Sequence, residues 1–166
     1  MNTKTKKLVV ASMMAALTCV VTMFIMVPSP FKGYLNLGDC LVLVSGWLLS
    51  PFYGGLAAGL GSALADLLSG YTVYAPMTFV IKALMALAAG YLFRMLHKKQ
   101  GVWFSGIVSG IAAEIIMVLG YFLFESLLYG PASSAVNIPA NSIQGIVGLV
   151  LGIVLLKILV KIKQIH

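Results

Sequence analysis

A small set of ionisable and amide side chains interrupts an otherwise apolar sequence. All four acidic residues of the 166-residue chain stand in or beside apolar stretches, together with one lysine and three amides. Carboxylates, an ammonium group and amides can pair with one another, or they can hold a small polar molecule through hydrogen bonds. The set comprises Asp39, Asp66, Lys82, Glu114, Glu125, Asn137, Asn141 and Gln144.

These residues do not have the spacing of known catalytic motifs. The sequence contains no His-Glu-x-x-His metal helix and no Gly-x-Ser-x-Gly nucleophile turn, and its histidines, His97 and His166, stand apart from the acids. The phosphate-binding loop Gly-x-x-x-x-Gly-Lys-Ser/Thr is also absent, so the chain cannot hydrolyse ATP by that route. Cys19 and Cys40 lack metal-ligand spacing, and we expect small buried thiols. The sequence therefore predicts a protein that is not an enzyme and holds no cofactor or metal.

The composition defines the environment in which this polar set must work. Hydrophobic residues make up 61% of the chain and charged residues only 9%, with a mean hydropathy of +1.05. Soluble domains carry about 25% charged residues, and disordered chains need low hydrophobicity. The chain is therefore predicted to be an integral membrane protein.

Glycine and proline divide the chain into six apolar segments. A helix needs roughly 20 residues to cross a bilayer, so a chain of this length holds six spans and no separate soluble domain. The first segment is too long for the core of a signal peptide, and we expect it to be retained. Gly55 and Gly59 in the third segment predict close helix packing. We expect one all-α domain over residues 1–166, with spans at 8–27, 38–49, 52–69, 76–96, 102–125 and 138–159.

The distribution of Lys and Arg predicts the orientation. With six spans both termini lie on one side of the membrane, and basic residues in short loops favour the cytoplasmic side. The opposite side has Lys32 alone. We therefore expect cytoplasmic termini in a prokaryotic plasma membrane, and we interpret the net charge of +7 as a topology signal rather than a nucleic-acid-binding surface. The basic residues on the side of the termini are Lys4, Lys6, Lys7, Arg94, Lys98, Lys99, Lys157, Lys161 and Lys163.

In this orientation the polar set gathers in the outer half of the membrane. At 1.5 Å per residue, Lys82 lies about 9 Å inside the outer face and Glu114 about 16 Å. Charged groups in lipid normally face a bundle interior or a wet cavity, and no polar track leads on to the cytoplasm. The pattern predicts an outward-facing binding pocket rather than a channel. The candidate ligand contacts are Phe31, Tyr34, Asn36, Asp66, Tyr74, Lys82, Glu114, Tyr121, Asn137, Asn141 and Gln144.

Several of these residues also have purely structural explanations. Asp39 could stabilise the N-terminus of its helix. Asp66 stands near a helix C-terminus and needs a cation, so Lys82 could serve as a partner of Asp66 or Glu114 rather than of a ligand. Glu125 stands near the membrane surface, where we expect it to be solvated.

Four segments of the sequence resemble the substrate-binding S component of energy-coupling-factor (ECF) transporters. The resemblance is closest to the riboflavin-type branch, which also contains binders of vitamin precursors. It covers residues 35–90 and part of the first span. The segments are Tyr34-Leu-Asn-Leu-Gly-Asp39, Ser50-Pro-Phe-Tyr-Gly-Gly55, Gly59-Leu-Gly-Ser-Ala-Leu-Ala-Asp66-Leu-Leu-Ser-Gly70-Tyr71, and Tyr74-Ala-Pro76 with Lys82.

The resemblance implies a function and a set of partners. It implies a six-helix membrane subunit that binds a vitamin or precursor from outside with high affinity. It also implies docking onto a transmembrane coupling subunit that two cytoplasmic ATPases energise, and movement of the S component in the membrane to carry the site inward. In that family an Ala-x-x-x-Ala pattern on the first helix contacts the coupling subunit, and here Ala11 and Ala15 match it.

Two other functions remain open from the residues alone. An autonomous secondary transporter would place polar residues or broken helices near the midplane, where this sequence has Glu114 and little else. A membrane scaffold without a ligand would use the polar set for internal pairing. For a ligand, the mixture of acids, amides, one cation and aromatics suits a B6-group pyridine, a thiamine precursor or riboflavin, in that order.

Overall fold

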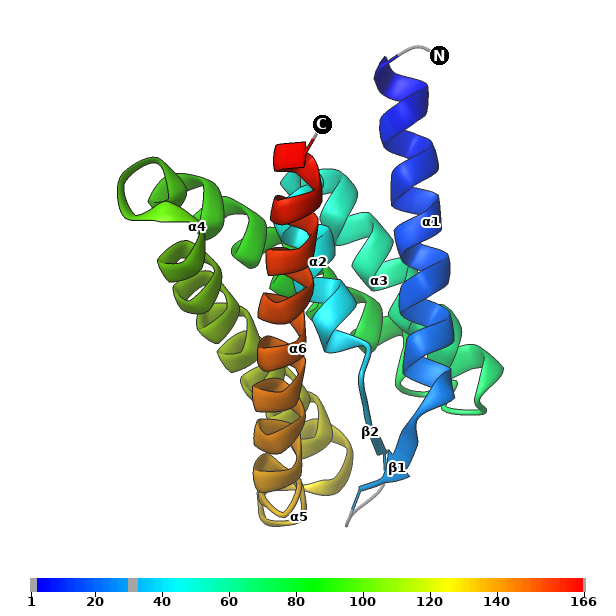
Figure 1. Cartoon of the computed structure of the whole chain (residues 1–166). Helices are drawn as coiled ribbons and strands as arrows, with labels where there is room; N and C mark the ends of the chain where they lie inside the picture. The colour runs from blue at the N-terminus through cyan, green and yellow to red at the C-terminus, as the bar shows by residue number, and fades with distance from the viewer. Residues whose placement is uncertain (1–2, 30–32, 166) are drawn as a thin grey trace.

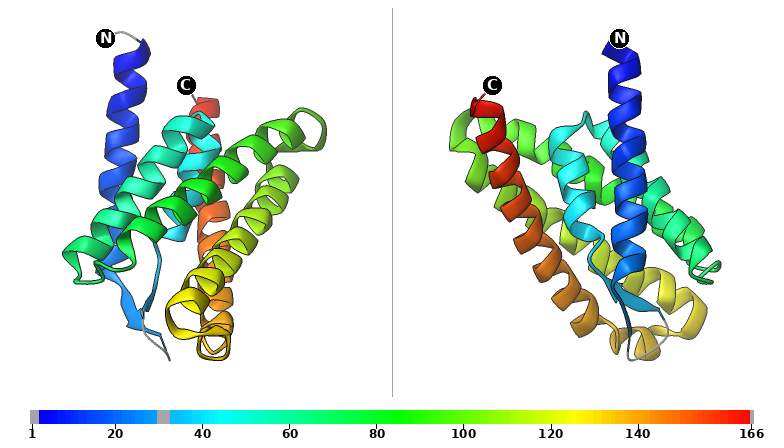
Figure 2. Two further views of the ribbon diagram at one scale, coloured as in Figure 1. Left: turned by 180° about the vertical axis from the view of Figure 1, so that it is seen from behind. Right: turned by 45° about the vertical axis from the view of Figure 1, so that its right-hand side comes forward.

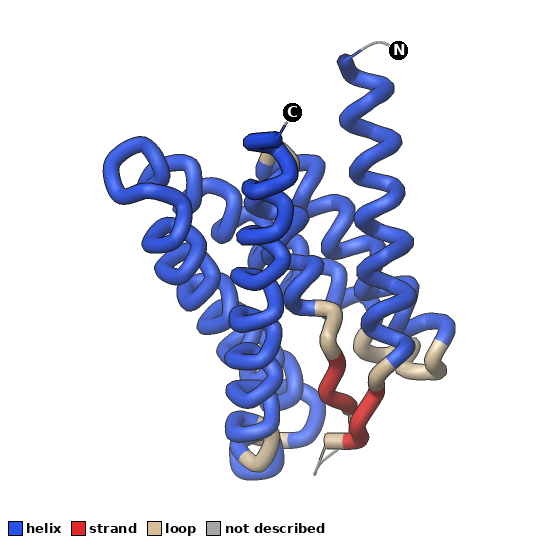
Figure 3. The backbone as a smooth tube through the Cα atoms, viewed as in Figure 1, coloured by secondary structure: helices blue, strands red, loops and turns tan. Residues whose placement is uncertain are grey.

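The structure is a computed structural model of a helical bundle that carries one small β-hairpin (Figures 1 and 3). It describes residues 3–29 and 33–165, so the predicted ligand contact Phe31 lies outside the described residues. The elements are α1 (Thr3–Phe24), β1 (Met26–Pro28), β2 (Tyr34–Asn36), α2 (Asp39–Leu48), α3 (Pro51–Leu68), α4 (Ala75–Tyr129), α5 (Pro131–Ala135) and α6 (Ile138–Ile165).

The longest helix, α4, is two helices joined at a sharp turn. Gly101 has φ 78° and ψ 172° in the middle of its 55 residues, a backbone conformation that glycine adopts without steric cost. The two arms of α4 run back alongside each other from this turn (Figures 1 and 2). The turn separates the predicted fourth and fifth spans.

Several helices match the dimensions of a bilayer. Within the described residues, α1, α4 and α6 are long and apolar enough to cross a membrane. Helix α3 has 18 residues and α2 only 10. Large apolar side chains such as Leu17 on α1 and Leu84 on α4 are about half exposed, as expected for a surface that faces lipid.

The end of the predicted first span differs from the structure. Residues 26–28 form strand β1 rather than the last turn of a helix, and Met26 pairs with Asn36 in an antiparallel hairpin with β2. Pro28 explains the difference, because proline lacks an N–H and disfavours helical backbone in the residue before it. The hairpin lies at the lower end of the bundle in Figure 1, below α1 and beside the lower part of α6, opposite both termini.

Helix α2 lies in the centre of the bundle, against α3, α4 and α6. Its residues Val42 and Leu43 are fully buried, and they pack with Met85 and Met117 from the two arms of α4 and with Leu156 from α6. This apolar core begins beside the polar residue Lys82, at Ile81, and extends toward the termini. Because its side chains come from both arms of α4, the turn at Gly101 is what allows the core to close.

Small residues bring α3 close to its neighbours. A Cβ atom on Gly59 would lie 2.8 Å from the carbonyl oxygen of Phe79 on α4, and one on Gly55 would lie 3.0 Å from Leu87. The predicted close packing at these two glycines is therefore confirmed. On the other side of α3, Ala11 of α1 is 7% exposed and packs with Ala57, so the Ala-x-x-x-Ala face of α1 lies against α3.

Candidate functional site

A polar cavity lies between the hairpin and the helices at the end of the bundle away from the termini. Side chains from α1, the hairpin, α3, both arms of α4 and α6 line it. Residues far apart in the sequence thus meet around one space. The predicted ligand contacts that line the cavity are Tyr34, Asn36, Asp66, Tyr74, Lys82, Tyr121, Asn137, Asn141 and Gln144.

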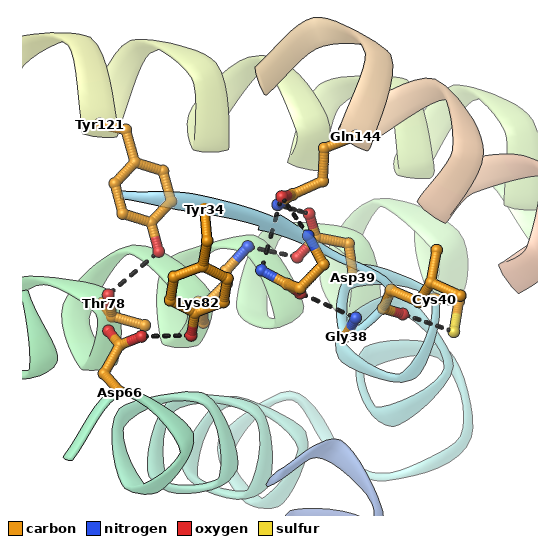
Figure 4. A network of polar contacts seen from close by, with 11 residues as sticks. Tyr34, Gly38, Asp39, Cys40, Asp66, Thr78, Lys82, Tyr121 and Gln144 are labelled. Carbon is orange, nitrogen blue, oxygen red and sulfur yellow. Dashed lines mark hydrogen bonds and ion pairs between the residues drawn. The ribbon is translucent and has the colours of Figure 1, made fainter. Parts of the chain in front are cut away.

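A buried ion pair forms the floor of this region. The ammonium group of Lys82 on α4 binds Oδ1 of Asp39 on α2, and the two residues are 2% and 0% exposed. Nε2 of Gln144 donates to the other carboxylate oxygen of Asp39 at 2.7 Å (Figure 4). The structural alternative in which Lys82 pairs with Asp66 or Glu114 is therefore not the one found, because α2 packs against the first arm of α4 and brings Asp39 to the lysine.

The hairpin is fastened to the helices by side chains that line the cavity. The backbone N–H of Asn36 donates to Oε1 of Gln144 at 2.9 Å, and the Tyr34 hydroxyl donates to Oδ1 of Asp66 at 2.5 Å. Burial and the neighbouring Asp66 carboxylate raise the pKa of the Tyr34 phenol above its usual 10.0, so the hydroxyl remains a donor at physiological pH. Ser29 donates to Oδ1 of Asn137 at the far end of the hairpin.

Glu125 is buried rather than solvated, which corrects the expectation from sequence. It is 3% exposed, and its two oxygens accept hydrogen bonds from Nδ2 of Asn137 at 3.0 Å and from the Tyr74 hydroxyl at 3.5 Å. The connection between α5 and α6 places Asn137 against this part of α4. The carboxylate therefore belongs to the cavity wall.

Glu114, by contrast, does not line the cavity. It is 8% exposed and packs against α6, where a Cβ atom on Gly145 would lie 3.0 Å from its Oε2. Neither carboxylate oxygen has a hydrogen-bond partner among the described residues. The predicted ligand contact at Glu114 thus lies behind the wall, and two glycines of α6, Gly145 and Gly148, leave the space it occupies.

An aromatic cluster and several hydroxyls complete the cavity. The rings of Tyr34 and Tyr71 lie 4.6 Å apart, Tyr71 and Tyr74 lie 6.3 Å apart, and Thr78 shares a hydrogen bond of 3.1 Å with Tyr121. Serine and threonine residues of a cavity wall are difficult to identify from sequence, because they occur throughout apolar helices and can bond to their own helix backbone. The lining residues that were not predicted as ligand contacts are Thr22, Ser29, Gly33, Ser62, Tyr71, Thr78 and Glu125.

The cavity is small in this structure and adjoins a larger outer space. Its volume is about 30 Å³, and one water needs at least roughly 10–15 Å³. The outer space has about 410 Å³ and shares Ser29, Gly33, Tyr71 and Tyr74 with the cavity. A molecule larger than a few waters therefore enters only if these side chains separate. In the part of the chain that the structure describes, no group of three His, Cys, Asp or Glu side chains could hold a metal ion.

Comparisons with known proteins agree with this architecture. The structure superposes on the S component of a bacterial ECF transporter with a TM-score of 0.74 and 26% identity, covering 96% of this chain and 98% of that one. It also superposes on the S component for biotin from an ECF-type ABC transporter, with a TM-score of 0.62, 21% identity and 95% coverage of each chain. The latter likeness concerns the fold.

The sequence has relatives as well. It is 34% identical to an uncharacterised protein of Pyrococcus woesei over 134 residues, which is 80% of this chain and 87% of the relative. It is 29% identical over 156 residues to the thiamine precursor transporter HmpT of Lactococcus lactis, which is 93% of this chain and 87% of that one. The family model of the ECF-type riboflavin transporter S component matches residues 2–161. The chain thus belongs to this family of S components, the substrate-binding subunits of ECF-type importers.

Proposed function

We propose that the polar cavity is the binding site for a water-soluble vitamin or vitamin precursor. The observation that carries this proposal is the convergence of buried polar side chains from the hairpin and four helices on one space in a chain with only 9% charged residues. Polar groups in a membrane bundle are costly and commonly mark a substrate pathway. The outer space between the hairpin and the segment after α3 supports entry of the ligand from that end.

The relatives narrow the ligand to a few chemical types. The name of the family refers to riboflavin, and the name of the relative HmpT refers to a thiamine precursor. Both ligands are nitrogen heterocycles with polar substituents. A B6-group pyridine has the same character. The tyrosines and the amides Asn141 and Gln144 suit such a ligand, because aromatic rings stack on its plane and amides bond its edge.

We further propose six membrane crossings with both termini in the cytoplasm. The two termini lie at the same end of the molecule as the turn at Gly101 (Figures 1 and 2), and the basic residues cluster in these segments. Positive charge favours the cytoplasmic side, so the hairpin would face outward. A C-terminal reporter that is active only in the cytoplasm should be active, and a signal from outside the cell would reverse the orientation.

The S component would work with a transmembrane coupling subunit and two cytoplasmic ATPases, which would supply ATP hydrolysis. Ala11 and Ala15 remain the proposed docking positions near the cytoplasmic end of α1, although they also pack α1 on α3. Ala11→Trp with Ala15→Trp should abolish assembly, measured by copurification of the subunits. Ala16→Trp, on the exposed side of α1, is the matched control. If Ala16→Trp alone prevented assembly, the coupling subunit would contact the exposed side of α1 and not Ala11 and Ala15.

Ligand binding by the purified chain tests the central proposal. The protein in detergent would be heated with riboflavin, pyridoxine or a hydroxymethylpyrimidine precursor of thiamine, and one of these should raise its melting temperature through binding to the folded state. Mass spectrometry of the protein as purified would identify a ligand that remains bound. If none of these compounds stabilised the protein, and the chain alone took up one of them into proteoliposomes, the protein would be an autonomous transporter.

A further inference from the structure

We infer that the cavity selects a flat aminopyrimidine-type ligand that donates hydrogen bonds and carries no negative charge, and that Asp66 is the residue that decides this selection. The inference rests on the proposed function and specifies the substrate of the same site. Three features of the described cavity support it: the balance of charge, an unpaired acceptor on Asp66, and the aromatic rings beside that acceptor.

The charge of the cavity wall disfavours anions. Among the described lining residues the acids are Asp66 and Glu125, and the cation is Lys82. The ammonium group of Lys82 is already paired with Asp39 below the cavity. A phosphate or carboxylate on the ligand would therefore face two acids in a buried site with no unpaired cation along the described wall, where like charges repel strongly.

Asp66 offers an acceptor that has no hydrogen-bond partner in the described part of the chain. Its Oδ1 accepts from Tyr34, but its Oδ2 is buried without such a partner, and the residue is 3% exposed. Thr78 lies beside this carboxylate, and its hydroxyl bonds Tyr121 (Figure 4). Glu125, in contrast, has a donor on each oxygen. A buried acceptor without a donor is unfavourable, so an N–H group of a ligand would find its best partner at Asp66.

The shape of the site favours one ring. Tyr34 and Tyr71 lie next to Asp66 with ring centroids 4.6 Å apart and ring planes tilted by 52°, and a flat heterocycle can stack on the face of either ring. The cavity of about 30 Å³ must widen for any ligand, and a single ring demands less widening than the three fused rings of riboflavin. An aminopyrimidine carries its amino donor in the plane of the ring, so the ring can stack on a tyrosine while the amino group donates to Oδ2 of Asp66.

The first test compares two ligands on the unmodified protein. Calorimetry in detergent would measure the Kd of 4-amino-5-hydroxymethyl-2-methylpyrimidine and of its 4-methoxy counterpart, in which an acceptor replaces the amino donor and the ring carries no N–H. We expect the amino compound to bind roughly 10- to 100-fold more tightly, since the methoxy compound leaves the Asp66 acceptor unpaired. Equal or tighter binding of the methoxy compound would overturn the inference.

The second test changes the protein. Asp66→Asn retains an oxygen for Tyr34 but puts an amide donor in place of Oδ2, so it should weaken the amino compound and reverse the preference between the two ligands. Glu125→Gln is the matched control, and it should weaken both ligands to a similar extent. A parallel loss for both ligands in Asp66→Asn would contradict the assignment. If that variant does not fold, the comparison on the unmodified protein decides.

The outcome also separates this inference from the proposed function. If riboflavin, pyridoxine or pyridoxal phosphate binds and neither pyrimidine does, the cavity is a vitamin site but the selection inferred from Asp66 is wrong. If none of the compounds binds, both the site and the inference fail. Binding of the amino compound with the expected preference supports both.

Discussion

The same helices build two unlike regions in this molecule. At the hairpin end, α2, α4 and α6 hold the Asp39–Lys82 ion pair and the amide of Gln144. Toward the termini the same three helices hold Leu43, Ala89 and Leu156, which are almost fully buried. The first region is held by directional bonds and the second by close packing.

The difference between the regions shows where a ligand can be accommodated. A hydrogen bond between cavity side chains can be exchanged for one to a ligand at little net cost, because each protein bond is worth only about 0.5–1.5 kcal/mol. Contacts in a close-packed apolar core have no such replacement, since a displaced side chain leaves a void. The polar region is therefore the part able to open, while the apolar region keeps the helices in place.

The largest expected effect comes from breaking the ion pair. Lys82→Met would leave the Asp39 carboxylate buried and unpaired, and removing one partner of a buried pair costs about 3–5 kcal/mol. Urea or thermal unfolding in detergent would measure the loss. The double variant Lys82→Met with Asp39→Asn should recover most of the stability. A double variant no more stable than the single one would show that the pair does not hold α2 to α4.

A cavity in the apolar region should lower stability without touching the ligand. Leu43→Ala removes a fully buried side chain, and such truncations cost about 2–5 kcal/mol. We expect a lower melting temperature and an unchanged Kd for the ligand of the folded protein. Leu84→Ala, at a position that is 49% exposed, is the control and should lose much less. A large change in Kd for Leu43→Ala would mean that the two regions are coupled.

The variant that removes a proposed ligand contact, Asn141→Ala, should change stability least. Asn141 lines the cavity from α6, and Asn141→Ala should cost about 1–3 kcal/mol of affinity, or roughly 10- to 100-fold in Kd. The melting temperature without ligand should stay close to that of the parent protein. Ser142→Ala, which removes a hydroxyl bonded to its own helix at Ile138, should change neither quantity. Unchanged affinity in Asn141→Ala would exclude this residue from the site.

The sequence predicted how deep each polar side chain lies along its span better than it predicted which neighbour that side chain faces. A helix rises by a constant amount per residue, so the position of Lys82, Tyr121 or Gln144 along its span follows from counting, and these residues do meet at one end of the bundle. The rotation of each helix about its axis depends on packing with its neighbours. For that reason the partner of Lys82 and the position of Glu114 behind the wall could not be predicted.

The hairpin and the small hydroxyls were missed for different reasons. The sequence around Pro28 predicted the end of a helix, but the pairing of Met26 with Asn36 depends on contacts between segments, which local preference does not determine. Ser62 and Thr78 look like ordinary helix residues until a neighbouring helix turns them into a cavity wall. The break at Gly101, in contrast, lies between the predicted spans 76–96 and 102–125, where a polar segment that ends in glycine interrupts the apolar sequence.

The turn at Gly101 also makes the protein divisible. Apart from the adjacent residues and the helix's own backbone, no described atom lies within 4 Å of the position that a Cβ would take there, and exposed turns of this kind tolerate interruption of the chain. A chain cut at this point would yield one fragment with Tyr34, Asp66 and Lys82 and another with Tyr121 and Asn141. Since neither fragment contains a complete cavity, coexpression of the two would make ligand capture a direct signal of their reassembly in the membrane.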